Sequence, residues 1–233
     1  MIQMLGIMLQ GAVISLEVFF LTLLFSLPLA LPLAFGRMSK HRVLRALING
    51  YLLIMRGTPL ILQLIFIYFA PKYLYKALHD TLGTLIGSPE FWQFLRSVLS
   101  YDRFIAVIIA FVLNYAAYFA EIYRGGIESI TKGQYEAAKV LGFTPSQTFG
   151  RIILPQVIKR ILPATGNEVI TLVKDTALAQ TIGVAELFHA AQNASAREFS
   201  TMPIFIAGVF YFIMNWIVSL AFTWYEKKLS YYE

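Results

Sequence analysis

Long apolar runs constrain the fold of this chain more than any other feature of its sequence. The first run, Ala12–Phe35, has 24 residues and a single charged side chain, Glu17. A helix of about 20 residues crosses the hydrocarbon core of a bilayer, which is about 30 Å thick. The chain is 58% hydrophobic and only 14% charged, against roughly 45–50% and 25% in soluble domains. We therefore expect an all-α, polytopic membrane helix bundle, formed as one transmembrane domain over residues 1–233.

The runs predict five transmembrane helices, of which the fourth is only weakly hydrophobic. Between the second and third spans we expect an external segment, 71–103, which suits an interfacial helix or an outer platform. Between the third and fourth spans we expect a cytoplasmic loop, 124–162. The five expected spans are 12–35, 47–70, 104–123, 163–182 and 203–225.

The basic residues predict the orientation of these spans. Four of them follow the first span at once, and basic residues are enriched in cytoplasmic loops. We therefore expect the N-terminus outside and the C-terminus in the cytoplasm, which makes the weak fourth span necessary. The four residues are Arg37, Lys40, Arg42 and Arg45.

The second span contains a break. Its continuous apolar part, Leu60–Ala70, has 11 residues and measures only about 16 Å as a helix, too short to cross alone. Thr58 and Pro59 predict an N-cap and a helix restart, and Pro59 leaves the carbonyl of Met55 without its helical partner. Arg56 just before the break is interpreted either as a cation snorkelling to the cytoplasmic surface or as a gate or solute contact.

Polar residues lie at mid-membrane depth in the third and fourth spans. Asn114, Tyr118 and Glu121 share one helix face in the third span, and Glu168 shares a face with Asp175 in the fourth. An unpaired polar group at this depth costs on the order of 2.5–3.5 kcal/mol. Each residue could pair with a neighbouring helix instead, but as a set they favour a path for a polar solute.

The cytoplasmic loop encodes a helix, a tight turn and a second helix. Gly142 stops the first helix, because glycine adopts the left-handed conformation at little cost. Thr144 then predicts an N-cap, followed by Pro145 at the first helical position and by Gln147, which completes a capping box. Pro155 marks where the second helix ends or bends. Such a module between two spans suits a docking site for another protein.

The sequence lacks the motifs of several functional classes. The chain has no cysteine and three histidines, so a metal site is not expected. It has no phosphate-binding loop, no nucleophile elbow and no His-Glu-x-x-His pair, so we expect no catalytic residues and no enzymatic activity. The net charge of +6 is explained by basic loops between spans, without nucleic acid.

The cytoplasmic module resembles the EAA signature of ABC-importer permeases. Glu136-Ala137-Ala138 is followed after three residues by Gly142, and after nine more by Ile152, one residue and Leu154-Pro155. The resemblance to the polar amino acid subfamily, the histidine, glutamine, arginine and cystine uptake systems, covers about Gly11 to Leu229. The further segments that carry it are Arg56-Gly57-Thr58-Pro59, Ala120–Ile127, Lys132-Gly133-Gln134 and Lys174-Asp175-Thr176.

The resemblance implies a set of partners and a location. The chain would pair with a second permease subunit, identical or homologous, in the bacterial cytoplasmic membrane, and would receive an amino acid from an extracytoplasmic binding protein. Two ABC ATPase subunits would dock at the cytoplasmic face and bind ATP and Mg²⁺, so this chain needs no cofactor. Thr144–Arg151 corresponds to the coupling helix. The residues expected to serve ATPase coupling are Glu136, Ala137, Ala138, Gly142, Thr144, Pro145, Ser146, Gln147 and Arg151.

The expected solute contacts are chosen by depth and helix face. A carboxylate such as Asp175 could hold an ammonium group, and Asn114 or Gln63 could orient a carboxylate. Arg56 and Pro59 are expected to act in gating or in structure. A stand-alone ion-coupled carrier or channel is the alternative, but it leaves the cytoplasmic module unexplained. A membrane scaffold without transport would leave the buried carboxylates unexplained. The full set of expected solute contacts is Asp175, Thr176, Asn114, Glu121 and Gln63.

Overall fold

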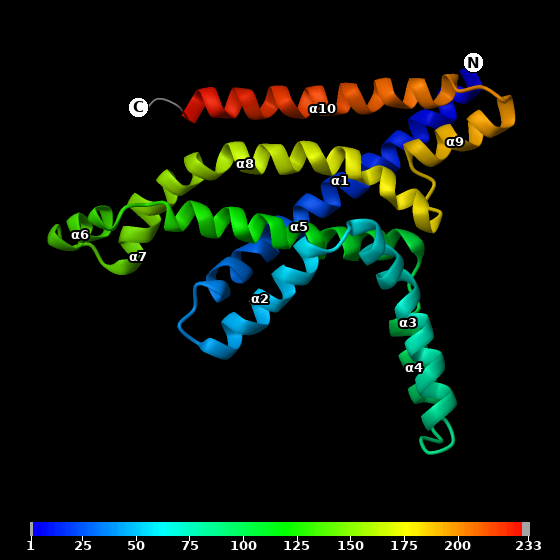
Figure 1. Cartoon of the computed structure of the whole chain (residues 1–233), viewed down its shortest axis with the longest axis horizontal. Coiled ribbons are helices and arrows are strands. Elements are labelled where there is room, and N and C mark those ends of the chain that lie inside the picture. The colour runs from blue at the N-terminus through cyan, green and yellow to red at the C-terminus, as the bar shows by residue number, and fades with distance from the viewer. Residues whose placement is uncertain (1, 230–233) are drawn as a thin grey trace.

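The computed structural model describes residues 2–229, so residues 1 and 230–233 of the expected domain 1–233 lie outside the described residues. Every regular element in the described part is helical (Figure 1). The elements are α1 Ile2–Arg37, α2 Arg42–Gly57, α3 Leu60–Leu82, α4 Pro89–Leu99, α5 Arg103–Glu128, α6 Lys132–Val140, α7 Pro145–Thr148, the π-helical turn η1 Phe149–Ile153, α8 Leu154–Asp175, the 3-10 segment η2 Thr176–Ile182, α9 Leu187–Glu198 and α10 Met202–Leu229.

The helices α5, α8 and α10 extend roughly along the long axis of the molecule and α1 crosses them obliquely, with α5 inside the bundle (Figure 1). α5 packs against α1, α2, α3 and α8. Its small residues Ala106, Ala110 and Ala117 are fully buried, and small side chains let membrane helices approach closely. The core therefore lies around α5, which also carries the polar residues of the third expected span.

Three helices of the described residues are long and apolar enough to cross a membrane by themselves: α1, α5 and α10. The pair α2 and α3 supplies a fourth crossing if it counts as one span, and it bends by 111° at the predicted break. The expected span 163–182 coincides with the end of α8 and with η2. Its charged residues keep α8 below the hydropathy of the other spans, so the fold itself shows three or four crossings.

The expected external segment 71–103 is helical for most of its length. α3 continues through Pro71 to Leu82, and α4 follows after a short connection. The helix therefore continues past residue 70, the expected end of the second span, and where the span itself ends stays a prediction. A proline inside a helix removes one hydrogen bond, but its own φ of about −65° is compatible with the helix, and Pro71 does not interrupt α3.

Within the expected cytoplasmic loop 124–162, α5 extends to Glu128 and α8 begins at Leu154, so the connection between these two helices covers residues 129–153. The predicted helix, turn and second helix are present as α6, the turn at Gly142, and α7. The prediction of an end or bend at Pro155 was wrong in detail. The chain passes from α7 through the wider turn η1 into α8, whose first turn contains Pro155, where a missing N–H group is tolerated.

Candidate functional site

The break between α2 and α3 is held by two buried amide side chains. The carbonyl of Met55, which Pro59 deprives of a helical partner, accepts hydrogen bonds from Gln63 Nε2 and from Asn114 Nδ2, both at 2.9 Å. Asn114 Nδ2 also donates to Gln63 Oε1 at 3.0 Å. Gln63 Nε2 further lies 2.8 Å from Thr58 Oγ1 and 3.1 Å from the Thr58 carbonyl. The Met55 and Thr58 carbonyls at the break are therefore hydrogen-bonded, and these bonds join α2, α3 and α5.

Thr58 has a different role from the predicted N-cap. Its hydroxyl donates back to the Ile54 carbonyl at 2.8 Å, so it closes the end of α2, and Pro59 occupies the N-cap position of α3. Proline has no side-chain acceptor, so α3 begins without a side-chain cap. The first backbone N–H groups of α3 therefore remain available at the break.

A cavity of about 470 Å³ lies beside this break. Two carboxylates of α8, Glu168 and Asp175, stand two turns apart on its wall. The Tyr115 hydroxyl donates to Asp175 Oδ2 at 2.7 Å. The cavity thus combines negative charge, hydroxyl groups and the start of α3. Its lining comprises Thr58, Pro59, Leu60, Ile61, Asn114, Tyr115, Tyr118, Glu168, Thr171, Asp175 and Leu178.

The structure brings two of the five expected solute contacts, Asn114 and Asp175, to this one cavity. The other three do not line it. Gln63 is buried in the helix break, and Thr176 is 1% exposed with its hydroxyl donating to the Val173 carbonyl. Glu121 lies in an ion-pair network described below.

Sequence reasoning did not select Tyr115, Glu168 or Thr171 for this cavity. The spacing of Glu168, Thr171 and Asp175, at i, i+3 and i+7, was the available signal, because it places all three on one helix face. Tyr115 follows Asn114 directly, and its position on the wall depends on how α5 packs against α8, which spacing does not reveal. In the part of the chain that the structure describes, no three His, Asp or Glu side chains are grouped to hold a metal ion.

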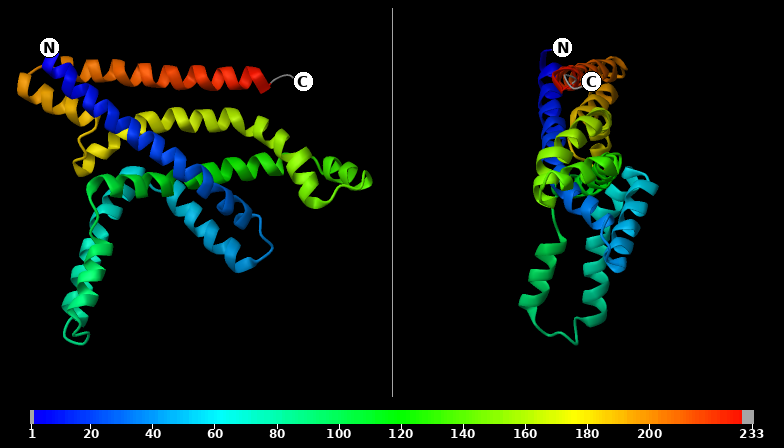
Figure 2. Two further views of the ribbon diagram at one scale, coloured as in Figure 1. Left: turned by 180° about the vertical axis from the view of Figure 1, so that it is seen from behind. Right: turned by 90° about the vertical axis from the view of Figure 1, so that its left-hand side faces the viewer.

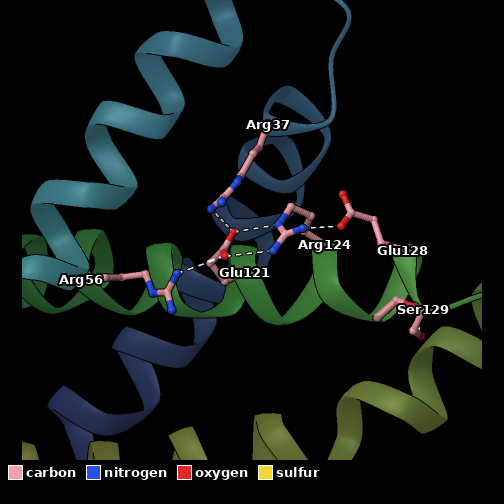
Figure 3. A network of polar contacts seen from close by, with 7 residues as sticks. Arg37, Arg56, Glu121, Arg124, Glu128 and Ser129 are labelled. Carbon is pink, nitrogen blue, oxygen red and sulfur yellow. Dashed lines mark hydrogen bonds and ion pairs between the residues drawn. The ribbon is translucent and has the colours of Figure 1, made fainter.

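Glu121 binds three arginines at one carboxylate (Figure 3). Arg37 at the end of α1 pairs with Oε1, Arg56 near the end of α2 pairs with Oε2 at 3.1 Å, and Arg124 pairs with both oxygens at 3.1 and 3.2 Å. Arg124 also pairs with Glu128 one turn further along α5. The Glu121 side chain is 14% exposed, so this cluster ties α1, α2 and α5 together.

Arg56 connects this network to the cavity. Its guanidinium lies over the ring of Tyr118, 5.5 Å from the centroid, and Tyr118 lines the cavity. Arg56 does not line the cavity itself, and its roles as a snorkelling cation or in gating stay predictions. It stands between the break in the second span and the ion-pair network.

The turn between α6 and α7 has the geometry that its residues predict. Gly142 has φ 78°, and the Phe143 N–H donates to the Ala138 carbonyl at 3.0 Å while the Gly142 N–H donates to that of Lys139 at 3.0 Å. This is the Schellman pattern of a helix C-terminus. At the start of α7, Thr144 and Gln147 form the reciprocal capping box, at 3.0 and 3.3 Å.

The surface of this turn is apolar and exposed. Val140 is 87% exposed and Leu141 74% exposed. Solvent-exposed apolar residues grouped at a turn outside the spans are typical of a protein interaction site. Ala138 is instead buried at 1%, whereas Glu136 and Ala137 of the same turn are exposed.

The segments that flank the turn pack against each other and against α8. Ile130 from the α5–α6 connection packs against Ile153 and Val157, and all three are buried. At Gly126 on α5 an added Cβ would lie 2.2 Å from Ile161 of α8, so the two helices are in close contact there. The α6–α7 turn is thus connected through η1 to α8 and to α5, the helices that carry the cavity.

The known proteins that are similar to this chain agree with one another. A family model described as "Binding-protein-dependent transport system inner membrane component" matches residues 26–231. The L-cystine transport system permease protein TcyB of Bacillus subtilis is 38% identical over 224 residues, which are 95% of this chain and 86% of that protein. The nopaline transport system permease protein NocM of Agrobacterium fabrum is 36% identical over 210 residues, or 88% of this chain and 80% of that protein.

Solved structures agree with this fold. A crystal structure of an amino acid ABC transporter with histidines has a TM-score of 0.79 at 30% sequence identity, and the match covers 98% of this chain and 96% of that one. An inward-facing MetNI methionine ABC transporter has a TM-score of 0.74 at 17% identity, with 98% of each chain covered. The second likeness concerns the fold alone.

Proposed function

The chain belongs to the family of binding-protein-dependent transport system inner membrane components, and from this membership we propose how its parts divide the work of transport. It is the transmembrane permease subunit of an ABC importer of amino acids, driven by a separate ATPase subunit. The relatives are named for cystine, glutamine, arginine, nopaline and octopine, which supports a polar amino acid as the solute here. A stand-alone ion-coupled carrier is not favoured by these relatives.

We assign five spans to the chain, with α8 as the fourth. Glu168, Thr171 and Asp175 lower the hydropathy of α8, but all three line the cavity and so need not face lipid. In Figure 1 the C-terminal end of α10 lies at the same end of the bundle as α6 and α7, and the N-terminus lies at the other end. Five crossings with the N-terminus outside and the C-terminus in the cytoplasm fit this arrangement and the basic residues near α6 and α7.

The cavity beside the helix break is our candidate solute site. An amino acid carries an ammonium and a carboxylate group, and the cavity offers complementary groups for both. Glu168 and Asp175 would hold the ammonium group. The start of α3, where uncapped N–H groups and the helix dipole favour negative charge, would hold the carboxylate. Asn114 lines the cavity but donates to Met55, so we give it a positioning role as well.

The α6–α7 turn is our candidate ATPase docking site. Its exposed apolar surface at Val140 and Leu141 supports protein contact, and its attachment to α5 and α8 supports transmission of movement to the cavity. Alternating access would then follow from rigid-body motion of the ATPase subunits. The further partners we propose are a second permease subunit and an extracytoplasmic amino acid-binding protein.

The single observation that carries the solute site is the pairing of two carboxylates with an uncapped helix start in one cavity. Replacing Asp175→Asn keeps the size of the side chain and the acceptor for Tyr115 but removes the charge. A hydrogen bond to a charged group contributes about 1.5–3 kcal/mol, so the substrate concentration for half-maximal uptake should rise roughly ten- to hundredfold.

The matched control is Asp80→Asn on the exposed, distal part of α3, which should leave uptake unchanged. Uptake and substrate-stimulated ATP hydrolysis would be measured in proteoliposomes containing the assembled transporter. Unaltered transport by the Asp175→Asn variant would remove this residue from the site. The same variant should retain its unfolding temperature, which separates loss of binding from loss of fold.

A further inference from the structure

Two helical segments stand apart from the bundle, and we call them the outer arm: residues 71–82 of α3 and α4, Pro89–Leu99. The Tyr101 hydroxyl donates to the Ile67 carbonyl at 2.5 Å, which places the last bundle contact of α3 beside the start of α5. Beyond that point the arm extends at a large angle to the long helices, at the end of α5 opposite α6 and α7 (Figures 1 and 2). The arm therefore runs across the direction of the spans.

The two helices of the arm hold each other through aromatic side chains. Tyr75 and His79 of α3 contact the ring of Trp92 of α4, at centroid distances of 6.3 and 4.9 Å. Trp92 is buried and donates from Nε1 to the Ile86 carbonyl at 2.8 Å. These contacts define which side of each helix faces the other.

Relative to that contact, α4 has one apolar and one polar flank. Phe91, Phe94 and Val98, at i, i+3 and i+7, share the first flank, and they are 42%, 65% and 54% exposed. Gln93 and Ser97, four residues apart, share the opposite flank. The apolar flank is unusual, because nothing in the described chain covers three large apolar side chains there.

The arm part of α3 is divided in the same way. Leu74, which is 52% exposed, and Thr81 lie on one flank, and Lys76 and Asp80 lie on the other. The two helices are antiparallel and right-handed. Turning about each helix axis in the same sense along the chain, starting from its contact residues, therefore leads to the same side of the pair in both helices. The hairpin as a whole thus has one apolar face and one polar face.

The direction of the apolar face follows from the handedness of the helices. The right-hand view of Figure 2 looks along the spans from the α6–α7 end, with α3 to the right of α4 and running away from the bundle. In that arrangement the apolar face is turned toward the α6–α7 end, and therefore toward the membrane layer. The polar face is turned outward, away from the bundle.

We propose that the outer arm lies in the interfacial region of the bilayer, with its apolar face inserted among the lipid chains at the end of the spans opposite α6 and α7. Amphipathic helices bind in this plane with aromatic and aliphatic residues on the buried face, and aromatic residues are enriched at the membrane–water interface. A soluble protein approaching from outside would meet the polar face, which argues against it as the occupant of the apolar one. The proposed position of the arm requires only that the chain spans a membrane. It is the same whether the N-terminus lies outside or in the cytoplasm.

The absence of cysteine from the chain allows a direct test with single labelled positions. Phe94→Cys and Val98→Cys would place a nitroxide label on the apolar face, and Gln93→Cys and Ser97→Cys would place it on the polar face of the same helix. The transporter, assembled with a cysteine-free ATPase, would be reconstituted into liposomes of phosphatidylethanolamine and phosphatidylglycerol. Power saturation would compare collisions with oxygen, which partitions into lipid, and with a water-soluble nickel complex.

We expect labels at positions 94 and 98 to collide mainly with oxygen and labels at positions 93 and 97 mainly with nickel. Nickel access at positions 94 and 98 equal to that at 93 and 97 would overturn the proposal, because the face would then be in water. Protection of 94 and 98 from both reagents would also overturn it, since protein would cover the face. Dipolar broadening between labels would in that case identify a second copy of the chain as the cover.

Discussion

At the scale of single residues, one backbone carbonyl accounts for two buried amides in the middle of the bundle. Pro59 cannot donate to the carbonyl of Met55, and an unpaired carbonyl away from water costs several kcal/mol in lipid. Gln63 and Asn114 supply the missing donors from α3 and α5. Their solute contact remains a prediction, and their hydrogen bonds to the break give them a structural role that can be tested separately.

Replacing Gln63→Leu should destabilise the protein. The change removes donors to Met55 and Thr58 and one of the two acceptors of Asn114, at a cost of about 1–3 kcal/mol. A thermal unfolding scan of the purified transporter in detergent should show a lower midpoint. Gln93→Leu on the exposed flank of α4 is the control and should have little effect. Unchanged stability combined with weaker uptake would instead support the original interpretation of Gln63 as a solute contact.

Replacing Glu121→Gln should loosen the contact among α1, α2 and α5. Three guanidinium groups would then surround a neutral amide, and the loss of charged hydrogen bonds to a mostly buried carboxylate costs about 1.5–3 kcal/mol. Chemical unfolding should require less denaturant than for the unaltered chain. Glu198→Gln, at an exposed position of α9, serves as control. Equal midpoints for the two variants would show that the cluster does not stabilise the bundle.

At the scale of elements, the α6–α7 turn was predictable because each of its signals is local. A glycine with positive φ, a threonine N-cap and a glutamine three residues later act within a few residues of one another. The π-helical turn at η1 was not predictable in this way. Proline at the start of a helix and proline at its end produce the same sequence signal, and packing of Ile153 against α5 decides between them.

Replacing Gly142→Val should uncouple the ATPase from the permease. A β-branched residue at φ 78° costs about 1–2 kcal/mol, which would shift the start of α7. Gly142→Asn is the matched control, because asparagine adopts the left-handed conformation more readily. Co-purification of the ATPase and substrate-stimulated ATP hydrolysis should fall for the valine variant and persist for the asparagine variant. Equal behaviour of both would argue that this turn does not dock the ATPase.

At the scale of the whole molecule, the sequence predicted the helical membrane class, the break at Pro59 and the helix–turn–helix at Gly142, since these depend on composition and short-range signals. It did not reveal which distant residues meet. Arg37, Arg56 and Glu121 are far apart in the chain, and only the packing of three helices brings them to one point. The outer arm was predicted only in part, because a proline such as Pro71 often marks the end of a helix.

The candidate solute site was predicted only in part for the same reason, because the sequence does not show which distant residues meet. Asn114 and Asp175 were selected by depth and face, and both line the cavity. Thr176 was selected in the same way, but its side chain is buried in the core. Adjacent residues of a helix point about 100° apart, so a cavity residue and a core residue can be neighbours in the chain.

This chain forms the passage, and a separate ATPase supplies the energy. Uptake of a labelled amino acid into proteoliposomes would separate the two roles, with the permease reconstituted with and without the ATPase and with the binding protein outside. We predict accumulation only when the ATPase is present with ATP and Mg²⁺ on its own side of the membrane. Accumulation driven by a proton or sodium gradient in vesicles that contain the permease alone would contradict the account.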